Sequence, residues 1–468
     1  MRFDPELAEM RFGLGLSPRV TGPGDLAAML RGVSGADHMA VRFPIEPFSA
    51  FLARLVVNRE LRKERRQAGA GSEGFTAATK QMSLGKRDAR MAQGDWLGQQ
   101  VQRRVWSESG FRERLVGFWA DHFTVQGKAG LLRRAVSPHV EEIIRPHIAG
   151  RFADLVIAAT TAPMMLHYLD QESAVGPGSA LADEMRAKGK LKKIGLNENL
   201  AREVLELHTL GVGAGYGQED VHQLAKLFTG MTYQPQVGFK FQQKAAEPGA
   251  ETVLGVSYGG PGNAKLADIH AALEDLAEHP STGLHIARKL VQHFVSDAPD
   301  PDLVAHVAGA FGATRGDLGA VYAALLEHEA AWGADLVNVK PPFDYLASAY
   351  RALALPEGAF VGMEERDVQR HLRVPLMQMG QPWERPPGPD GWPEEDAAWI
   401  HPQGLAARID WAMRGPGEGM AELPDPRDFV TAALGTRVSD EVVFAARAAE
   451  SRREGIGLVL ASPAFQRR

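Results

Sequence analysis

Apolar residues recur at spacings of three and four along most of the chain, which is the pattern of amphipathic helices. Segments that alternate apolar and polar residues are few, and Ala, Leu, Arg and Glu are abundant. The periodicity predicts helices over 93–109, 111–124, 137–147, 151–162, 218–229, 264–278, 282–296, 301–312, 317–328, 341–354, 402–413, 427–434, 439–453 and 455–461. The predicted fold class is therefore mostly α, with one large multi-helix domain.

One internal stretch has the character of β-structure. Residues 237–241 and 252–258 are rich in Val, Phe and Tyr, and they flank a polar turn that contains Pro248 and Gly249. Short β-prone runs on either side of such a turn favour a β-hairpin. We therefore expect a helical core over residues 1–355 with a β-hairpin inserted near 232–258.

Beyond that core, proline and glycine rise sharply between residues 381 and 393. This composition predicts an extended strap that carries Trp383 and Trp392, with Trp399 soon after. We expect the rings to pin the strap to the body, although such rings also form sugar or peptide grooves. Residues 356–468 are thus predicted to be a proline-rich and tryptophan-rich strap with C-terminal helices packed on the core.

A charged stretch from residue 58 to residue 90 contains the run Arg-Lys-Glu-Arg-Arg at 62–66 and a Gly/Ser-rich patch. Because highly charged segments of this kind bury little apolar surface, the stretch predicts a solvated helix followed by a mobile loop.

Composition narrows the classes of function. The 52 basic and 58 acidic residues give a formal net charge of −6, which argues against general nucleic-acid binding. The absence of cysteine excludes thiolate nucleophiles and sulfur-ligated metals. No apolar run approaches the roughly 18 residues of a membrane span, and the first ten residues do not resemble a signal peptide. The expected location is cytoplasmic.

The segment from Asn197 to Gly211 is a strong predicted helix that carries a histidine on its apolar face. At about 100° per residue, Asn197 and His208 fall within the arc of Leu200 and Val204. A second predicted helix, 111–124, places His122 in the same way among phenylalanine and tryptophan. Two core-facing histidines on separate helices indicate an interior polar site, if the helices converge.

Two chemistries are open for such a site. His122 and His208 can ligate zinc, iron or manganese, with Glu203 or Asp121 as the carboxylate ligand. The His-Glu-x-x-His spacing that places two ligands on one helix face is absent. Without a metal, either histidine can act as general base, with Asn197 or Arg202 stabilising negative charge.

These residues predict a hydrolase-like enzyme with catalytic His122, His208, Asn197, Arg202 and Glu203. The alternative is a non-catalytic binding or assembly protein that acts with a partner, in which the buried histidines are only structural. An enzyme would have an open cavity that reaches His122 and His208, whereas the alternative predicts a sealed core.

The chain resembles the bacterial family called domain of unknown function 1800 over nearly its whole length. The resemblance rests on RFGLG at 11–15, FWADHFTV at 118–125, the segment 197–211, YGQEDV at 216–221, TG at 229–230, HP at 279–280, GQP at 380–382 and GWP at 391–393. It implies a mostly helical protein of uncharacterised activity, with no accepted catalytic residues.

The same resemblance bears on partners and location. Relatives often carry export signals and often accompany a protein that looks like a sulfatase or phosphatase, so a partner of that kind is implied. This sequence departs from the family in lacking a visible export signal, and in having Leu200 where relatives have tyrosine.

Overall fold

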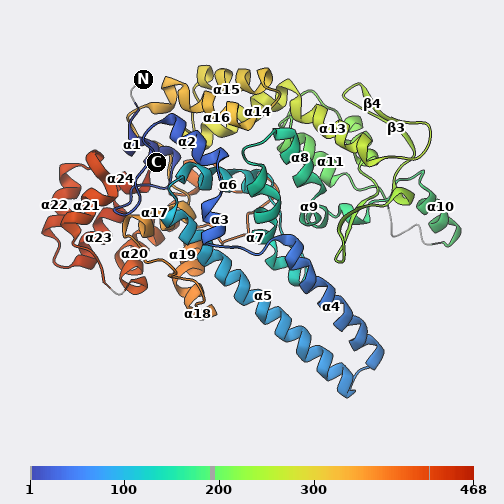
Figure 1. Cartoon of the computed structure of the whole chain (residues 1–468), viewed down its shortest axis with the longest axis horizontal. Helices are drawn as coiled ribbons and strands as arrows, with labels where there is room; N and C mark the ends of the chain where they lie inside the picture. The colour runs from blue at the N-terminus through green and yellow to red at the C-terminus, as the bar shows by residue number, and fades with distance from the viewer. Residues whose placement is uncertain (1–2, 190–194, 421) are drawn as a thin grey trace.

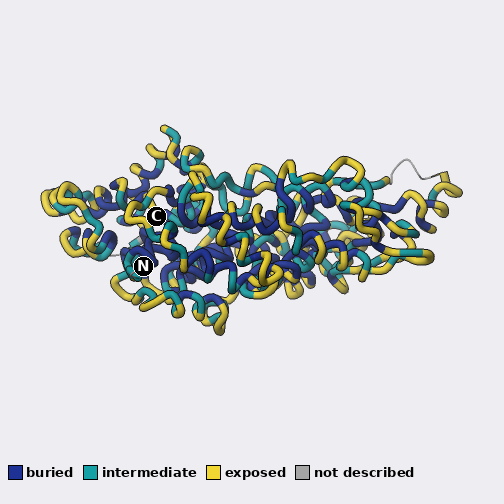
Figure 2. Tube along the Cα trace, turned by 90° about the horizontal axis from the view of Figure 1, so that it is seen from above, coloured by how far each residue is buried: buried dark blue, intermediate teal, exposed yellow. Residues whose placement is uncertain are grey.

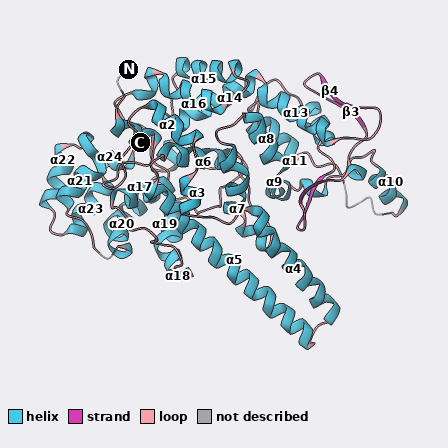
Figure 3. Ribbon diagram, viewed as in Figure 1, coloured by secondary structure: helices cyan, strands magenta, loops and turns pink. Residues whose placement is uncertain are grey.

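The computed structural model describes residues 3–189, 195–420 and 422–468, and most of this chain is helical (Figure 3). The mostly α fold class is confirmed. The N-terminal half contains α1 (Pro5–Leu7), α2 (Leu26–Ser34), α3 (His38–Arg42), α4 (Phe48–Ala68), α5 (Glu73–Trp106), α6 (Gly110–His122), α7 (Val136–His139), α8 (Phe152–Thr161), α9 (Pro163–Tyr168), α10 (Ala180–Ala187), α11 (Asn199–Glu203) and α12 (Gln218–Leu227).

The C-terminal half is also helical and ends in a group of short helices around α20 (Figure 1). Its helices are α13 (Leu266–Glu278), α14 (Pro280–Phe294), α15 (Pro301–Ala313), α16 (Leu318–Glu327), α17 (Pro342–Ala352), α18 (Glu365–Val368), α19 (Val374–Gln378), α20 (Pro402–Gly419), α21 (Pro426–Leu434), α22 (Asp440–Ala448), α23 (Arg452–Ala461) and α24 (Pro463–Gln466).

Local sequence signals explain many helix ends. Asp300 caps α15 by accepting a hydrogen bond of 2.9 Å from the backbone N–H of Leu303, and Pro301 fills the first helical turn. An acidic cap followed by proline satisfies a free N–H and presets the backbone for a helix. The helix predicted over 137–147 is instead broken into α7, a π-helical turn at Val140–Ile144 and a 3-10 turn. Pro146 explains the break, because proline has no N–H to continue the helix.

In the part of the chain that the structure describes, the strands form two separate antiparallel hairpins at one end of the molecule (Figure 3). In the first, β1 (Met231–Gln234) pairs with β2 (Gly238–Phe241); in the second, β3 (Gly249–Val253) pairs with β4 (Val256–Gly260). The predicted pairing of 237–241 with 252–258 is therefore wrong: 238–241 is strand β2, whereas 252–258 contains the end of β3, the turn at Leu254 and Gly255, and the start of β4. Each strand pairs with its nearest neighbour in sequence, because a short loop costs the least entropy to close.

Two large hydrophobic clusters and a small one at Val175, Ala182 and Ala245 form the core of the described residues, and buried residues run through the middle of an elongated body (Figure 2). The first cluster collects α6, α8 and the helices from α11 to α16. The second joins Leu97 and Val101 of α5 and Tyr345 of α17 to Leu460 of α23. Apolar residues from both sides of residue 355 thus share one core.

Helices α4 and α5 form an antiparallel arm that projects from the body (Figure 1). The predicted solvated helix is present, but the loop is confined to the turn at 69–72. Ser72 caps α5 by accepting a hydrogen bond of 3.1 Å from the N–H of Phe75. The strong cap and the absence of proline let the charged stretch continue as helix.

None of the helices in the described ranges is long and apolar enough to cross a membrane.

Candidate active site

The structure brings the two predicted histidines together. The ring centroids of His122 and His208 lie 6.1 Å apart, and Nε2 of His122 is 3.1 Å from the backbone oxygen of His208. His208 closes a π-helical turn at Val204–His208 that follows α11. The wider turn directs its ring differently from a regular helix.

This pair is sealed in an aromatic core. His122 lies 5.3 Å from Trp119 and 6.3 Å from Phe152, centroid to centroid, and both histidine side chains are almost fully buried. Burial lowers the pKa of His208 to about 3 and places that of His122 well below its usual value. Both rings are therefore neutral near pH 7. Neither ring lines the cavity beneath the strap. Their surroundings therefore resemble the sealed core that was predicted for a non-catalytic binding or assembly protein.

A third histidine, which the sequence patterns did not place in the core, joins this pair. His285 of α14 lies 6.1 Å from the ring of His122, and its Nε2 is 3.1 Å from the backbone oxygen of Leu207. His285 points away from the apolar arc of its own helix, so helical periodicity gave no signal for this contact. The three rings therefore tie α6, α14 and the π-helical turn together.

Asn197 does not face the core as predicted, because α11 begins only at Asn199. Its amide donates to the backbone oxygen of Leu169 at 2.8 Å, and its oxygen accepts from the N–H of Asn199 at 2.9 Å. The side chain is occupied in joining the start of this helix to the chain after α9. Its contacts are those of a structural connector.

Arg202 and Glu203 lie on the partly exposed side of the same helix. Arg202 pairs with Glu198 at 3.6 Å and with Glu206 at 3.3 Å, N to O. Burial and the nearby charge of Glu206 raise the pKa of Glu203. The structure gives neither residue a hydrogen bond to His122 or His208 among the contacts of the described residues.

The metal prediction finds no matching geometry in the part of the chain that the structure describes, which has no group of three or more His, Asp or Glu side chains suited to one ion. Of the four proposed ligands, His122 and His208 are close to each other. Asp121 instead lies in the cavity beneath the strap.

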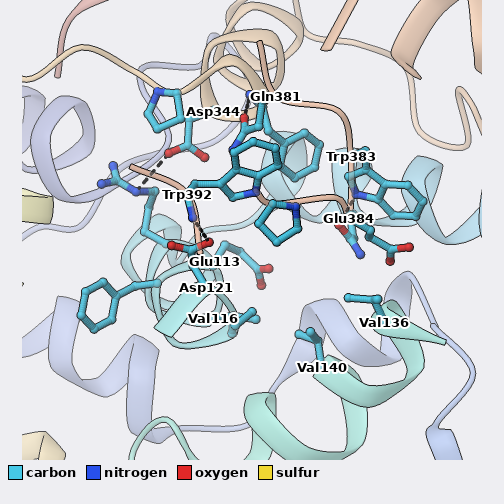
Figure 4. A pocket seen from close by; sticks show the side chains of 18 of the residues that line it. Glu113, Val116, Asp121, Val136, Val140, Asp344, Gln381, Trp383, Glu384 and Trp392 are labelled. Carbon is cyan, nitrogen blue, oxygen red and sulfur yellow. Dashed lines mark hydrogen bonds and ion pairs between the residues drawn. The ribbon is translucent and has the colours of Figure 1, made fainter. Parts of the chain in front are cut away.

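That cavity, of about 210 Å³, lies between α6 and the strap, and we refer to it as the strap pocket (Figure 4). Its walls come from α5, α6, α7, α14 and the start of α17, and its roof comes from residues 381–399. Its lining includes Asp121, His293, Trp383, Glu384, Trp392, Glu394 and Trp399. The predicted role of the strap tryptophans is thus extended, since all three also line a cavity.

Asp121 is held against the strap at one end of this pocket (Figure 4). Its Oδ1 accepts a hydrogen bond of 2.9 Å from the backbone N–H of Trp392. Gly391 makes this approach possible, since a Cβ at that position would lie 2.6 Å from Oδ2 of Asp121. Burial, together with the negative charge of Glu394, raises the pKa of Asp121 to about 8. Asp121 is therefore largely protonated near pH 7.

Glu394 is paired with His293, whose Nδ1 lies 2.9 Å from each carboxylate oxygen. Burial lowers the pKa of His293 to about 4, so the ring is neutral near pH 7 and Nδ1–H donates to the carboxylate. Burial alone would raise the pKa of Glu394, but the contact with His293 and the charge of Arg468 lower it. Two neighbouring carboxyl groups thus have pKa values displaced in opposite directions.

A third carboxyl group lies further along the strap. Glu384 accepts a hydrogen bond from the hydroxyl of Ser137 and another, of 2.7 Å, from Nε2 of Gln93. Burial raises its pKa to about 7. Figure 4 shows Glu384 beside Trp383, away from the Asp121 end.

Arginine side chains around Asp344 also line the strap pocket. Asp344 lies between Arg104, at 3.5 Å, and Arg114, at 3.4 Å, and it also pairs with Arg468. Burial would raise the pKa of Asp344, but the three guanidinium groups hold it well below its usual value. This cluster fixes α17 against α5 and α6 and so sets the width of the pocket.

Sequence patterns missed His293, Glu394 and Glu384. A signal existed for His293, which lies seven residues after Ile286 and therefore shares its buried helix face. Glu394 and Glu384 lie in the irregular strap, where no periodicity indicates which side chains point inward. Only their nearness to Trp383 and Trp392 in sequence could have drawn attention to them.

The fold and this pocket define a mostly helical protein with a cavity, lined by aromatic and charged side chains, beneath a tryptophan-bearing strap. The chain belongs to the family described as protein of unknown function (DUF1800), whose family model matches residues 11–467 of the 468. No curated protein and no solved structure matches it significantly.

Proposed function

We propose that this protein is a hydrolase that cleaves glycosidic bonds in the strap pocket, with Asp121 as the general acid and Glu394 as its partner carboxylate. The observation that supports the proposal most is that both carboxyl groups line the same pocket, in which the pKa of Asp121 is raised to about 8 and that of Glu394 is lowered. One carboxyl group can therefore donate a proton near pH 7 while the other is ionised.

This pair of protonation states suits hydrolysis of an acetal. The protonated carboxyl group donates to the leaving oxygen as the bond breaks, and the ionised one takes a proton from the attacking water or attacks the sugar carbon itself. His293 is a positioning residue, because its N–H orients Glu394 and keeps it ionised. The proposed catalytic role thus falls to Asp121, which the sequence predicted as a metal ligand, and not to the buried histidines.

The walls of the pocket favour a carbohydrate. Trp383, Trp392 and Trp399 line it together with Phe118 and Phe343, and flat aromatic faces pack against the apolar faces of sugar rings. Gln381 also lines the pocket; its oxygen accepts from the N–H of Phe343 at 2.8 Å, and its amide nitrogen can donate to a sugar hydroxyl. Pockets of this mixed character bind polyhydroxylated ligands.

The test is hydrolysis of aryl glycosides that vary in sugar and anomeric linkage, together with reducing-end release from polysaccharides. On a substrate that the wild-type protein cleaves, we expect Asp121→Asn and Glu394→Gln to lower kcat by about 10²- to 10⁴-fold. Glu395→Gln is the matched control, since this neighbouring glutamate is exposed and does not line the pocket.

The pH profile adds a second criterion. The wild-type rate should fall as the pH rises through about 8, because Asp121 then loses the proton that it donates. Full activity of Asp121→Asn, or no cleavage of any of these substrates by the folded wild-type protein, would contradict the proposal and favour the binding or assembly alternative.

A further inference from the structure

A second cavity, of about 290 Å³, lies beside the strap pocket, and Trp383 lines both. Four arginines face it, and we refer to it as the arginine pocket. Its charged residues are Arg90, Arg134, Arg373, Arg385 and Glu365. The arginines come from four separate segments: α5, the 3-10 turn Gly130–Arg134, the π-helical turn Gln369–Arg373 and the strap.

The single carboxylate in this lining leaves much of the positive charge uncompensated. Glu365 accepts a hydrogen bond of 2.7 Å from Nη1 of Arg373. Nη2 of the same guanidinium is buried and has no hydrogen-bond partner among the described residues. Arg134 donates to the amide oxygen of Gln93, which is neutral. Oε2 of Glu365 is likewise buried without a partner among the described residues, but this one carboxylate faces four guanidinium groups, so the lining keeps an excess of positive charge.

Holding these four arginines close together is electrostatically unfavourable. Burial lowers the pKa of Arg134, and the charges of Arg90, Arg373 and Arg385 lower it further. Like charges held close together in a cavity repel one another, and a bound anion removes that repulsion. The guanidinium of Arg373 also lies 5.7 Å from the ring centre of Trp383, which restricts its orientation.

We propose that the arginine pocket binds a tetrahedral oxyanion, namely a phosphate or sulfate group. Guanidinium groups present paired N–H donors that match the oxygens of such groups, and convergent arginines are the usual means of binding them. Gln93 and Gln369 also line the pocket, but their amide groups already donate to Glu384 and Glu365, so the arginines are the groups that hold the anion.

The position of the pocket suggests how a bound anion acts on its surroundings. Gln93 donates to Glu384 in the strap pocket and accepts from Arg134 in the arginine pocket. An anion that draws Arg134 toward itself competes with this contact. Binding does not depend on hydrolysis, so the site can be tested whether or not the protein cleaves glycosides.

The experiment is calorimetric titration of the full chain with sodium sulfate and sodium phosphate at low ionic strength. Arg134→Gln and Arg373→Gln should each weaken binding by about tenfold or more. Arg87→Gln is the matched control, because this exposed arginine lies about one turn before Arg90 on α5 and does not line the pocket. Arg90→Gln guards against a folding defect, since Arg90 is exposed and its replacement leaves the core unchanged.

Two further probes, glucose 6-sulfate and glucose 6-phosphate, separate a free anion from one carried by a larger ligand. Tighter binding of the esters than of the inorganic ions assigns the pocket to an esterified ligand that extends past Trp383, and the reverse order assigns it to a free anion. Equal affinities in the wild-type protein, Arg134→Gln and Arg90→Gln would overturn the proposal. Absence of binding by every probe at up to about 10 mM would do the same.

Discussion

At the scale of single residues, the protonation state of Asp121 is the most consequential feature of the molecule. Its carboxyl group lies against the strap, where the N–H of Trp392 donates to it and Glu394 carries a nearby negative charge. Because the fold favours the protonated form, the stability of the protein should depend on pH through this residue.

Replacement of Asp121 by asparagine is expected to remove the pH dependence of stability that arises from this carboxyl group. The folded pKa, about 8, exceeds the usual value of 3.8, so the contribution of Asp121 to stability is full below about pH 4 and is lost as the pH rises toward 8. The stability of Asp121→Asn relative to the wild-type protein should therefore increase between pH 5 and pH 8 in thermal unfolding. Asp88→Asn, at an exposed position of α5, is the control, and an unchanged difference between the two pH values would refute the raised pKa.

A side chain at Gly391 is expected to be unfavourable for two reasons, the backbone conformation and a close contact. Comparison with Gly358 distinguishes the two effects. The φ of +83° at Gly391 disfavours L-residues, and an added Cβ would lie 2.6 Å from Asp121. Gly358 has a similar φ of +80° but open space around it. Gly358→Ala should cost about 1–2 kcal/mol for the backbone alone, and Gly391→Ala about 1–3 kcal/mol more in chemical denaturation. Equal costs would show that the strap does not press on Asp121.

At the scale of elements, the π-helical turn after α11 and the end of α6 form the joint that carries the histidine pair. The hydrogen bond between the His122 ring and the backbone of His208 links two helices that lie far apart in sequence. Since both rings are neutral and enclosed, this joint is expected to weaken when acid charges them.

His208→Gln tests that joint. The folded pKa of His208, about 3, lies below its usual 6.5, so its contribution to stability is present above about pH 6.5 and is lost as the pH falls toward 3. The variant should be less stable than the wild-type protein at pH 7 by about 1–3 kcal/mol, and the gap should narrow by pH 4. His38→Gln, at an exposed position, should show no such change. A gap that stays constant with pH would contradict the buried neutral state.

At the scale of the whole molecule, the second hydrophobic cluster determines whether the chain can be cut into parts that fold independently. It combines α5 and α17 with the helices after the strap. The division of the chain at residue 355 stays a prediction from sequence composition. Residues from both sides of this position pack in the same cluster.

A chain cut at that point should therefore not fold as two independent parts. A fragment of residues 356–468 would expose the partners of Leu97, Val101 and Tyr345, and we expect it to unfold without a cooperative transition in circular dichroism. Mixing it with a fragment of residues 1–355 should restore helicity. Cooperative unfolding of the isolated C-terminal fragment would show that the shared cluster is dispensable.

The sequence alone determined the helical class, most helix positions, two strand-forming segments and the inward direction of His122 and His208. These features depend on residues close together in the chain, where a period of 3.6 or a capping side chain is sufficient. It did not determine strand pairing or the break near Pro146, which depend on competition between local alternatives.

The tertiary structure decided the strap pocket and the arginine pocket. Asp121, His293 and Glu394 come from two helices and an irregular segment separated by more than a hundred residues each, and no pattern within one element relates them. Their protonation also arises from burial and from neighbouring charges, which exist only after the strap closes over α6. For that reason the sequence alone did not indicate the roles that we propose for these three residues.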